Sequence, residues 1–160
     1  MAFSYQKEVG KYNKTAIPGD RANQQPVIYA PQNFVTAPDL GTAVPVQVGG
    51  FVWRNASNEN IVEGGGTGAP LGFAERVQNF PNYEVSTEGT LVIPGGAEVN
   101  VAIQGDFYIQ ADATTSAGAT VYAVTSNGAA TLTSGAGVAD TGFKTFNATT
   151  SGGMAIITKR

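Results

Sequence analysis

Four carboxylates are the residues of this sequence that could do chemistry in pairs. Glu84 with Glu88, and Asp106 with Asp112, supply the side chains that a glycosidase uses as acid and base on opposite sides of one bond. Neither spacing selects a pair, and Asp106 falls on the polar face of an alternating segment, where we expect it to be solvated. Calcium would also use carboxylates and carbonyls, but no Asp-x-Asp-x-Asp-Gly pattern is present. The acidic residues therefore predict no catalytic or metal site.

A run of glycines, Gly64-Gly65-Gly66-Thr67-Gly68, invites comparison with a phosphate-binding loop. No Gly-Lys-Ser/Thr follows it and no helix is predicted to begin there, so we interpret it as a flexible hairpin tip. The chain also has no cysteine and no histidine. This excludes disulfides, Cys/His zinc sites, cysteine nucleophiles, Ser-His-Asp triads and histidine-ligated haem. We expect a protein that is not an enzyme and has no cofactor.

The charges divide the 160 residues into two parts. Residues 1–25 hold four bases and two acids, whereas residues 26–160 hold five bases and ten acids. The net charge of −3 gives no basic face for nucleic acid, and no apolar run approaches the roughly 20 residues that cross a bilayer. The first residues also lack the apolar core of a secretory signal. A basic segment on an acidic body favours contact with an acidic surface, although scattered solvating charges are the alternative.

The elements that position these residues change character near residue 43. Residues 1–43 contain prolines at 18, 26, 31 and 38 and little apolar periodicity, which predicts an extended N-terminal arm. Its aromatic side chains must dock on the protein's own body or on a neighbour. Residues 44–160 show period-two alternation and frequent turns, which predict the body of the protein.

The body is predicted to be all-β. From Glu98 to Gln110, apolar side chains occupy odd positions and polar ones even positions, with Gly105 on the buried face at a bend or close approach. A hairpin with a type I′ turn is expected around Asn127-Gly128, a second hairpin links residues 143–146 to 154–158, and residues 134–142 are expected to be a mobile loop. Seven to nine short antiparallel strands indicate a single compact β-barrel or β-sandwich.

Four motifs, in a consistent order, resemble those of one protein family. They are Gly50-Phe51-Val52-Trp53-Arg54, Gly68-Ala69-Pro70-Leu71-Gly72-Phe73-Ala74-Glu75-Arg76, Leu91-Val92-Ile93-Pro94-Gly95-Gly96 and Gln104-Gly105-Asp106-Phe107-Tyr108. With the upstream turn at residues 18–22, they make the sequence similar to the bacteriophage structural cement, or capsid decoration, proteins. None of these motifs is catalytic.

The resemblance implies a viral structural protein, made in the host cytoplasm, that lies on the outer surface of an icosahedral head. There it would assemble as a homo-oligomer, a dimer or trimer, and would bridge neighbouring subunits of the major capsid protein, with no nucleic acid, membrane or cofactor involved. Residues 1–25 of the arm carry the basic charge and two tyrosines, so the expected capsid or intersubunit contacts are Tyr5, Lys7, Lys11, Tyr12, Lys14 and Arg21.

Two other functions stay open at this point. A carbohydrate-binding β-sandwich of a host-recognition appendage would present exposed aromatic side chains, and the alternation places Tyr108 and Tyr122 toward solvent. A small glycosidase would depend on the carboxylates that no motif supports.

Overall fold

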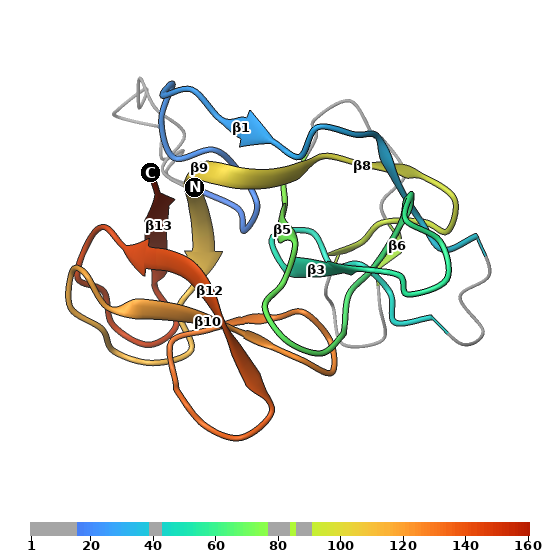
Figure 1. Ribbon diagram of the computed structural model, residues 1–160. Helices are drawn as coiled ribbons and strands as arrows, with labels where there is room; N and C mark the ends of the chain where they lie inside the picture. The colour runs from blue at the N-terminus through green and yellow to red at the C-terminus, as the bar shows by residue number, and fades with distance from the viewer. Residues whose placement is uncertain (1–15, 39–42, 77–83, 86–90) are drawn as a thin grey trace, which may run out of the picture.

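The computed structural model describes residues 16–38, 43–76, 84–85 and 91–160. Within these ranges the chain forms strands and turns without a helix, which confirms the all-β prediction (Figure 1). Within the described residues the chain has no helix that could span a membrane. The strands are β1 (Ile28–Tyr29), β2 (Phe34–Thr36), β3 (Phe51–Arg54), β4 (Ile61–Glu63), β5 (Gly72–Ala74), β6 (Glu84–Val85), β7 (Leu91–Val92), β8 (Glu98–Val99), β9 (Val101–Gln110), β10 (Thr120–Val124), β11 (Ala130–Thr131), β12 (Val138–Thr145) and β13 (Met154–Lys159).

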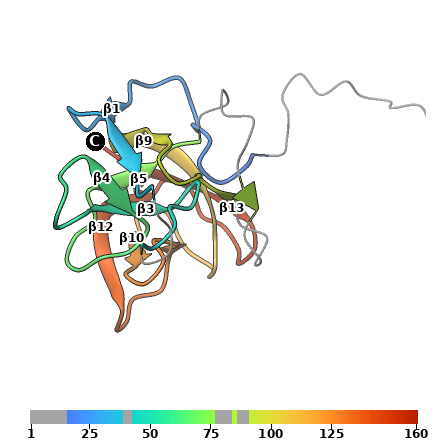
Figure 2. The same ribbon diagram turned by 90° about the vertical axis from the view of Figure 1, so that its right-hand side faces the viewer.

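Eleven of these strands form one continuous sheet. Its order is β11-β10-β12-β13-β9-β5-β3-β4-β2-β8, with β1 also paired to β9, while β6 and β7 form a separate pair. The pairings are antiparallel as expected, except that β2 and β4 run parallel. Strand β9 connects the two halves, because its first part pairs with β1 and β5 and its second part with β13 (Figures 1 and 2).

The middle of the sheet is buried on both faces, so alternate residues of one strand enter two different hydrophobic clusters. Phe51 and Phe73 pack with Phe107 and Phe143 in the first cluster. Their rings meet closely, with 5.3 Å between the centroids of Phe51 and Phe73 and 4.8 Å between those of Phe73 and Phe107. Val52 enters the second cluster instead, together with residues of β2, β4 and β8. The aromatic cluster therefore joins β3 and β5 to β9 and β12 across the two halves of the sheet.

Strand β9 departs from simple alternation in its middle. Ala102 is fully buried while Ile103 is half-buried, and Asp106 is buried where solvent was expected. Gly105 lies between them with a φ of 144°, and a Cβ built there would lie 3.1 Å from Cγ2 of Val27. The predicted close approach of another segment at Gly105 is therefore confirmed.

The two predicted hairpins form, but the turn of the first is different. A type I′ turn requires a positive φ at both central residues. Gly128 has a φ of 72°, but among the described residues only glycines have a positive φ, so Asn127 does not. The type I′ prediction is therefore wrong. The Gly128 N–H donates to the carbonyl of Val124 at 2.8 Å, and the Asn127 side-chain oxygen accepts from the Ala129 N–H at 3.0 Å. The loop between β10 and β11 is longer than two residues, and the Asn127 side-chain bond lies within it.

The predicted loop at residues 134–142 is wrong over its second half. Residues from Val138 onward belong to β12 and pair with β10, with Asp140 opposite Tyr122. The small side chains of this segment give no apolar alternation that would predict a strand. Thr141 is nevertheless buried, and its hydroxyl donates to the Val121 carbonyl at 2.7 Å. A satisfied buried hydroxyl replaces an apolar side chain at this position.

The glycine run at residues 64–68 is not a flexible tip. A Cβ on Gly64 would lie 2.0 Å from the Pro45 carbonyl oxygen, and one on Gly66 would lie 2.4 Å from Cγ of Trp53. These glycines are needed because the backbone packs directly against other chain segments, so the run has a packing role.

Candidate functional site

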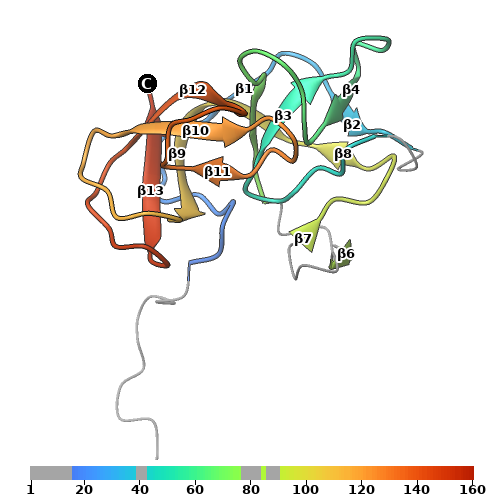
Figure 3. The same ribbon diagram turned by 90° about the horizontal axis from the view of Figure 1, so that it is seen from below.

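The segment that precedes β1 lies along β9, on the edge opposite β13 (Figure 3). The Tyr108 N–H donates to the Asp20 carbonyl at 2.9 Å, and the Ala22 N–H donates to the Asp106 carbonyl at 2.9 Å. Arg21 is bridged to Phe107 in the antiparallel sense. These bonds join residues more than 80 positions apart and fix the segment as an additional edge of the sheet.

Glu75 is the first of two buried acids that this segment covers. The residue is 6% exposed, and its carboxylate accepts hydrogen bonds from Arg21 Nε and from the Tyr29 hydroxyl. The Arg21 guanidinium also donates to the Tyr29 hydroxyl. Because removing a carboxylate from water is costly unless it is paired and hydrogen-bonded, Arg21 and Tyr29 allow Glu75 to lie beneath the segment.

The contacts around Glu75 shift two pKa values. The hydrogen bond to Glu75 raises the pKa of Arg21 above its ordinary value, which keeps the guanidinium charged. Burial, followed by the hydrogen bond to Glu75, raises the pKa of Tyr29 to about 12. The Tyr29 hydroxyl therefore keeps its proton at neutral pH and acts as a donor to the carboxylate.

Asp106 is the second buried acid, and the expectation that it is solvated is wrong. It is 3% exposed and accepts hydrogen bonds from Asn23 at 2.6 Å, from the Thr158 hydroxyl at 2.5 Å and from the Arg160 guanidinium at 2.6 Å. The alternation correctly places its side chain on the outer face of β9. It could not reveal that residues near both ends of the chain cover that face.

A third ion pair completes the set, because Arg76 donates to Asp20 at 3.1 Å. We call residues 20–23, with their partners Glu75, Arg76, Asp106 and Arg160, the N-terminal clasp. Each acid of the clasp has a basic partner, so the set is locally neutral. The clasp can hold a chain segment in place, but it offers no reacting group aimed into a cavity.

The other carboxylates form no site with the clasp. Asp112 accepts from the Thr131 hydroxyl and from the Leu132 N–H at 2.9 Å, so Asp106 and Asp112 belong to separate networks. Glu88 and the side chain of Glu84 lie outside the described residues. Among the described residues, no group of three or more acids could hold a metal ion.

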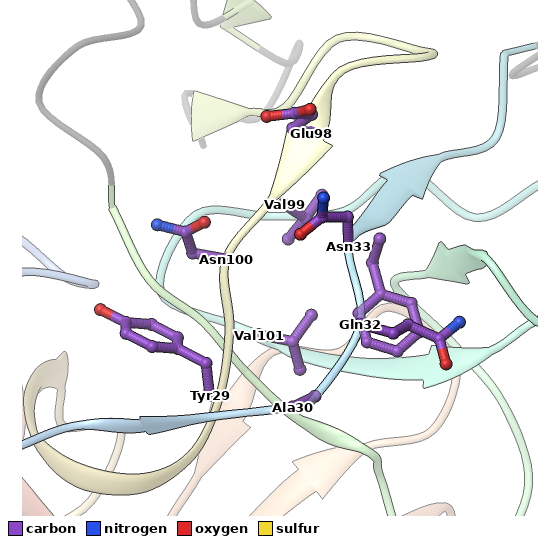
Figure 4. A pocket seen from close by; sticks show the side chains of 9 residues that line it. Tyr29, Ala30, Gln32, Asn33, Glu98, Val99, Asn100 and Val101 are labelled. Carbon is purple, nitrogen blue, oxygen red and sulfur yellow. The ribbon is translucent and has the colours of Figure 1, made fainter.

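A groove of about 220 Å³ lies where β1, β2, β8 and β9 approach one another (Figure 4). Tyr29 and Asn100 lie on one side and Gln32 on the other, with Val101 between them. Among the described residues that line the groove, Glu98 alone is charged, and the Tyr29 hydroxyl is engaged by Glu75. The groove therefore lacks the paired groups that acid–base or nucleophilic chemistry requires.

The two tyrosines of the carbohydrate-binding alternative are separated in the sheet. Tyr108 is on β9 and Tyr122 on β10, and strands β13 and β12 lie between them. With strands about 4.8 Å apart, the two backbones are separated by about 14 Å, so the rings do not form one platform.

Of the six expected contact residues, the structure describes Arg21 alone. Arg21 is half-exposed and is engaged within its own chain. Tyr5, Lys7, Lys11, Tyr12 and Lys14 lie outside the described residues.

The comparisons with known proteins identify the family. The family model "Structural cement protein (E217 gp24/Pam3 gp6)" matches residues 5–159, which is nearly the whole chain. The chain belongs to this phage structural cement protein family. As a cement protein it has a capsid decoration role, and the resemblance seen in the sequence is confirmed.

A solved structure supports the fold of the cement protein. A chain from the capsid of Myoviridae phage XM1 superposes with a TM-score of 0.63 at 19% sequence identity, covering 99% of this chain and 97% of that chain. No curated protein matches the sequence. Membership of the family makes this chain a capsid-associated structural protein that is located in the virion.

Sequence reasoning missed most of the clasp. Glu75 stood inside a family-like motif without an assigned role, and nothing singled out Asn23, Thr158 or Arg160. The partners in these contacts are between 52 and 83 positions apart, so no local pattern could pair them.

Proposed function

We propose that this cement protein binds the outer surface of an expanded phage head and connects neighbouring subunits of the major capsid protein. We further propose that it does so as a homo-oligomer, a dimer or trimer, after synthesis in the host cytoplasm. The observation that carries the proposal is the clasp, because it anchors a basic N-terminal segment to an otherwise acidic body. Family membership supports the capsid as the partner.

The charge distribution explains the use of such a segment. Residues 1–15 hold three lysines and one glutamate, whereas residues 16–160 hold six bases and eleven acids. An acidic body by itself is repelled by an acidic surface, and a basic segment reverses that interaction locally. The proposed contacts are therefore Tyr5, Lys7, Lys11, Tyr12 and Lys14, while Arg21 serves to hold the segment in place.

The clasp also lowers the cost of binding. Main-chain bonds and ion pairs fix residues 19–23 before any partner arrives, so less chain has to be ordered on association. A protein that binds the expanded lattice but not the procapsid stabilises the expanded state by mass action. This role requires no catalytic step, cofactor or nucleic acid.

The test is co-sedimentation of the purified protein with expanded, genome-free heads that lack it, with procapsids compared in parallel. Saturable binding to expanded heads alone is expected. Equal binding to procapsids would refute the preference for the expanded state, and no binding to either particle would refute the proposal as a whole.

The contact segment is tested in the same assay with Lys7, Lys11 and Lys14 all changed to Gln. We expect weaker binding and a smaller dependence on salt, because three charges leave the contact. Lys144→Gln is the matched control, since Lys144 is an exposed lysine of the body. Equal loss in both variants would contradict a specific role for the segment.

A further inference from the structure

The outer face of the sheet formed by β12, β13 and β9 carries a row of three large apolar side chains. Lys144 on β12 is opposite Thr158 on β13, and the Phe146 N–H donates to the Ile156 carbonyl at 2.7 Å, so Phe146 lies across from Ile156. Ile156 in turn is opposite Tyr108 on β9. We call Phe146, Ile156 and Tyr108 the outer row.

Their neighbours show that the outer row faces away from the core. Thr145, Ile157 and Phe107 occupy the adjacent positions on the same three strands and are all buried. Since successive side chains alternate across a sheet, the outer row lies on the opposite face. Phe146 is 66% exposed, the largest value for a large apolar side chain among the described residues.

Tyr108 and Ile156 are half-buried beside the exposed Phe146, and an apolar row on three adjacent strands that is open to solvent at one end indicates an interaction surface. Cross-strand neighbours have Cβ atoms about 5 Å apart, so the three side chains form a continuous strip. Such a strip suits an extended partner segment with aromatic side chains.

The N-terminal segment leaves the body beside this strip. The Gly19 N–H donates to the Tyr108 carbonyl at 2.9 Å, which places the segment next to the β9 end of the outer row. Followed backward from Ala22 to Gly19, it passes from Asp106 toward Tyr108 and so runs antiparallel to β9. Before Gly19 the chain turns, because the Asp20 N–H donates to the Ile17 carbonyl at 3.1 Å and Gly19 has a φ of 93°. Figure 3 shows the first described residues beyond the arrowhead of β9.

The length of residues 1–15 sets how far they reach from this point of exit. Fully extended, 15 residues reach about 50 Å, which is enough to cross to an adjacent molecule.

We propose that the outer row of one copy binds N-terminal residues 1–15 of a neighbouring copy. This inference rests on the proposed function, because it names the partner of the contact segment. Residues 1–15 supply Phe3, Tyr5 and Tyr12 for the apolar strip, and their net charge of +2 complements the −5 of residues 16–160. Exchange of such segments closes a dimer or a trimer, since each copy gives one segment and receives one.

The experiment uses the absence of cysteine from the chain. Two single variants of the full-length protein, Tyr5→Cys and Phe146→Cys, are mixed and oxidised in solution and on expanded heads, and Tyr12→Cys is paired with Phe146→Cys in the same way. A link formed in the mixture joins two different copies. The matched control pairs Tyr5→Cys with Ser57→Cys, because Ser57 is exposed and follows β3 in the other half of the sheet.

We expect at least about tenfold more mixed dimer with Phe146→Cys than with Ser57→Cys, because a disulfide needs Cβ atoms within about 4 Å. Equal yields from the two pairs, or no mixed dimer in either setting, would overturn the inference. It would also be overturned if the double variant Tyr5→Cys/Phe146→Cys linked within one chain and the mixture did not link.

A second measurement separates this inference from the proposed function. Phe146→Ser changes an exposed side chain and leaves the buried ones in place, and it should remove the mixed dimer made by Tyr5→Cys and Ile156→Cys. Wild-type protein that binds heads while forming no mixed dimer contradicts the inference alone. Mixed dimers in solution without head binding contradict the proposed function alone.

Discussion

Replacing Asp106 by Ala should destabilise the body, because this carboxylate joins three separate parts of the chain. It accepts hydrogen bonds from Asn23, Thr158 and Arg160. A bond to a charged group contributes about 1.5–3 kcal/mol, which would give an upper limit of about 9 kcal/mol for three. Arg160 and Asn23 are exposed and return to water when the carboxylate is removed, so their bonds contribute much less. We therefore expect a loss of about 2–4 kcal/mol.

The assay is urea unfolding, followed by thermal unfolding. The urea midpoint should fall while the m-value stays constant, and the melting temperature should fall by about 5–15 °C, at 2–4 °C per kcal/mol for a chain of this size. Asp106→Asn keeps the shape and the oxygen that accepts from Thr158, so it should lose less. Glu59→Ala, an exposed acid, is the control. A loss of under about 0.5 kcal/mol for Asp106→Ala, the range of surface substitutions, would refute the stabilising role of the clasp.

Three further predictions concern the segment, the glycine run and Tyr29. Deleting residues 1–15 should leave the urea midpoint unchanged, whereas deleting residues 1–25 should lower it, because Glu75 then loses Arg21 and Asp106 loses Asn23. Equal urea midpoints for the two deletions would argue against the clasp. Gly64→Ala should lower the free energy of unfolding by about 2 kcal/mol or more, since its Cβ would lie 2.0 Å from the Pro45 carbonyl oxygen. Gly135→Ala, with open space around it, should be close to neutral in urea unfolding. A neutral Gly64→Ala would show that the backbone shifts to make room. The pKa of Tyr29 is raised from 10.0 to about 12. The free energy of unfolding that wild type gains over Tyr29→Phe should therefore be complete below pH 10 and should decline as the pH rises toward 12. A gain that is constant across this pH range would contradict the assignment of Tyr29 as donor to Glu75.

Local patterns predicted the elements whose stability depends on local geometry. The alternation from Glu98 to Gln110 marked the longest strand, and residues 143–146 and 154–158 paired as expected. The predictions that were wrong involve contacts across the fold. Residues 138–142 entered β12 because Tyr122 and Val124 of β10 lie beside them, and this pairing is invisible in their small side chains.

The clasp could not be predicted for the same reason. Alternation alone assigns Asp106 to solvent, and only the arrival of Asn23 and Arg160 from the two ends of the chain changes its surroundings. The sequence around Glu75 likewise shows no partner for its charge, and Arg21, which covers it, is 54 positions away. Buried charges become predictable only when their partners are known, because burial and pairing occur together.

Three consecutive residues of β9 connect the clasp, which holds the N-terminal segment, with the outer row, the proposed binding surface. Asp106 is held by the clasp, Phe107 lies in the aromatic cluster, and Tyr108 belongs to the outer row. A pull on the N-terminal segment is therefore resisted first by its main-chain bonds to Asp106 and Tyr108, and then by the packed core behind Phe107. Because the segment and the outer row share one strand, a load received through the proposed contact with a neighbouring copy would pass directly into the core. A protein that reinforces a pressurised shell needs this connection, since a contact segment on a flexible linker would transmit little force.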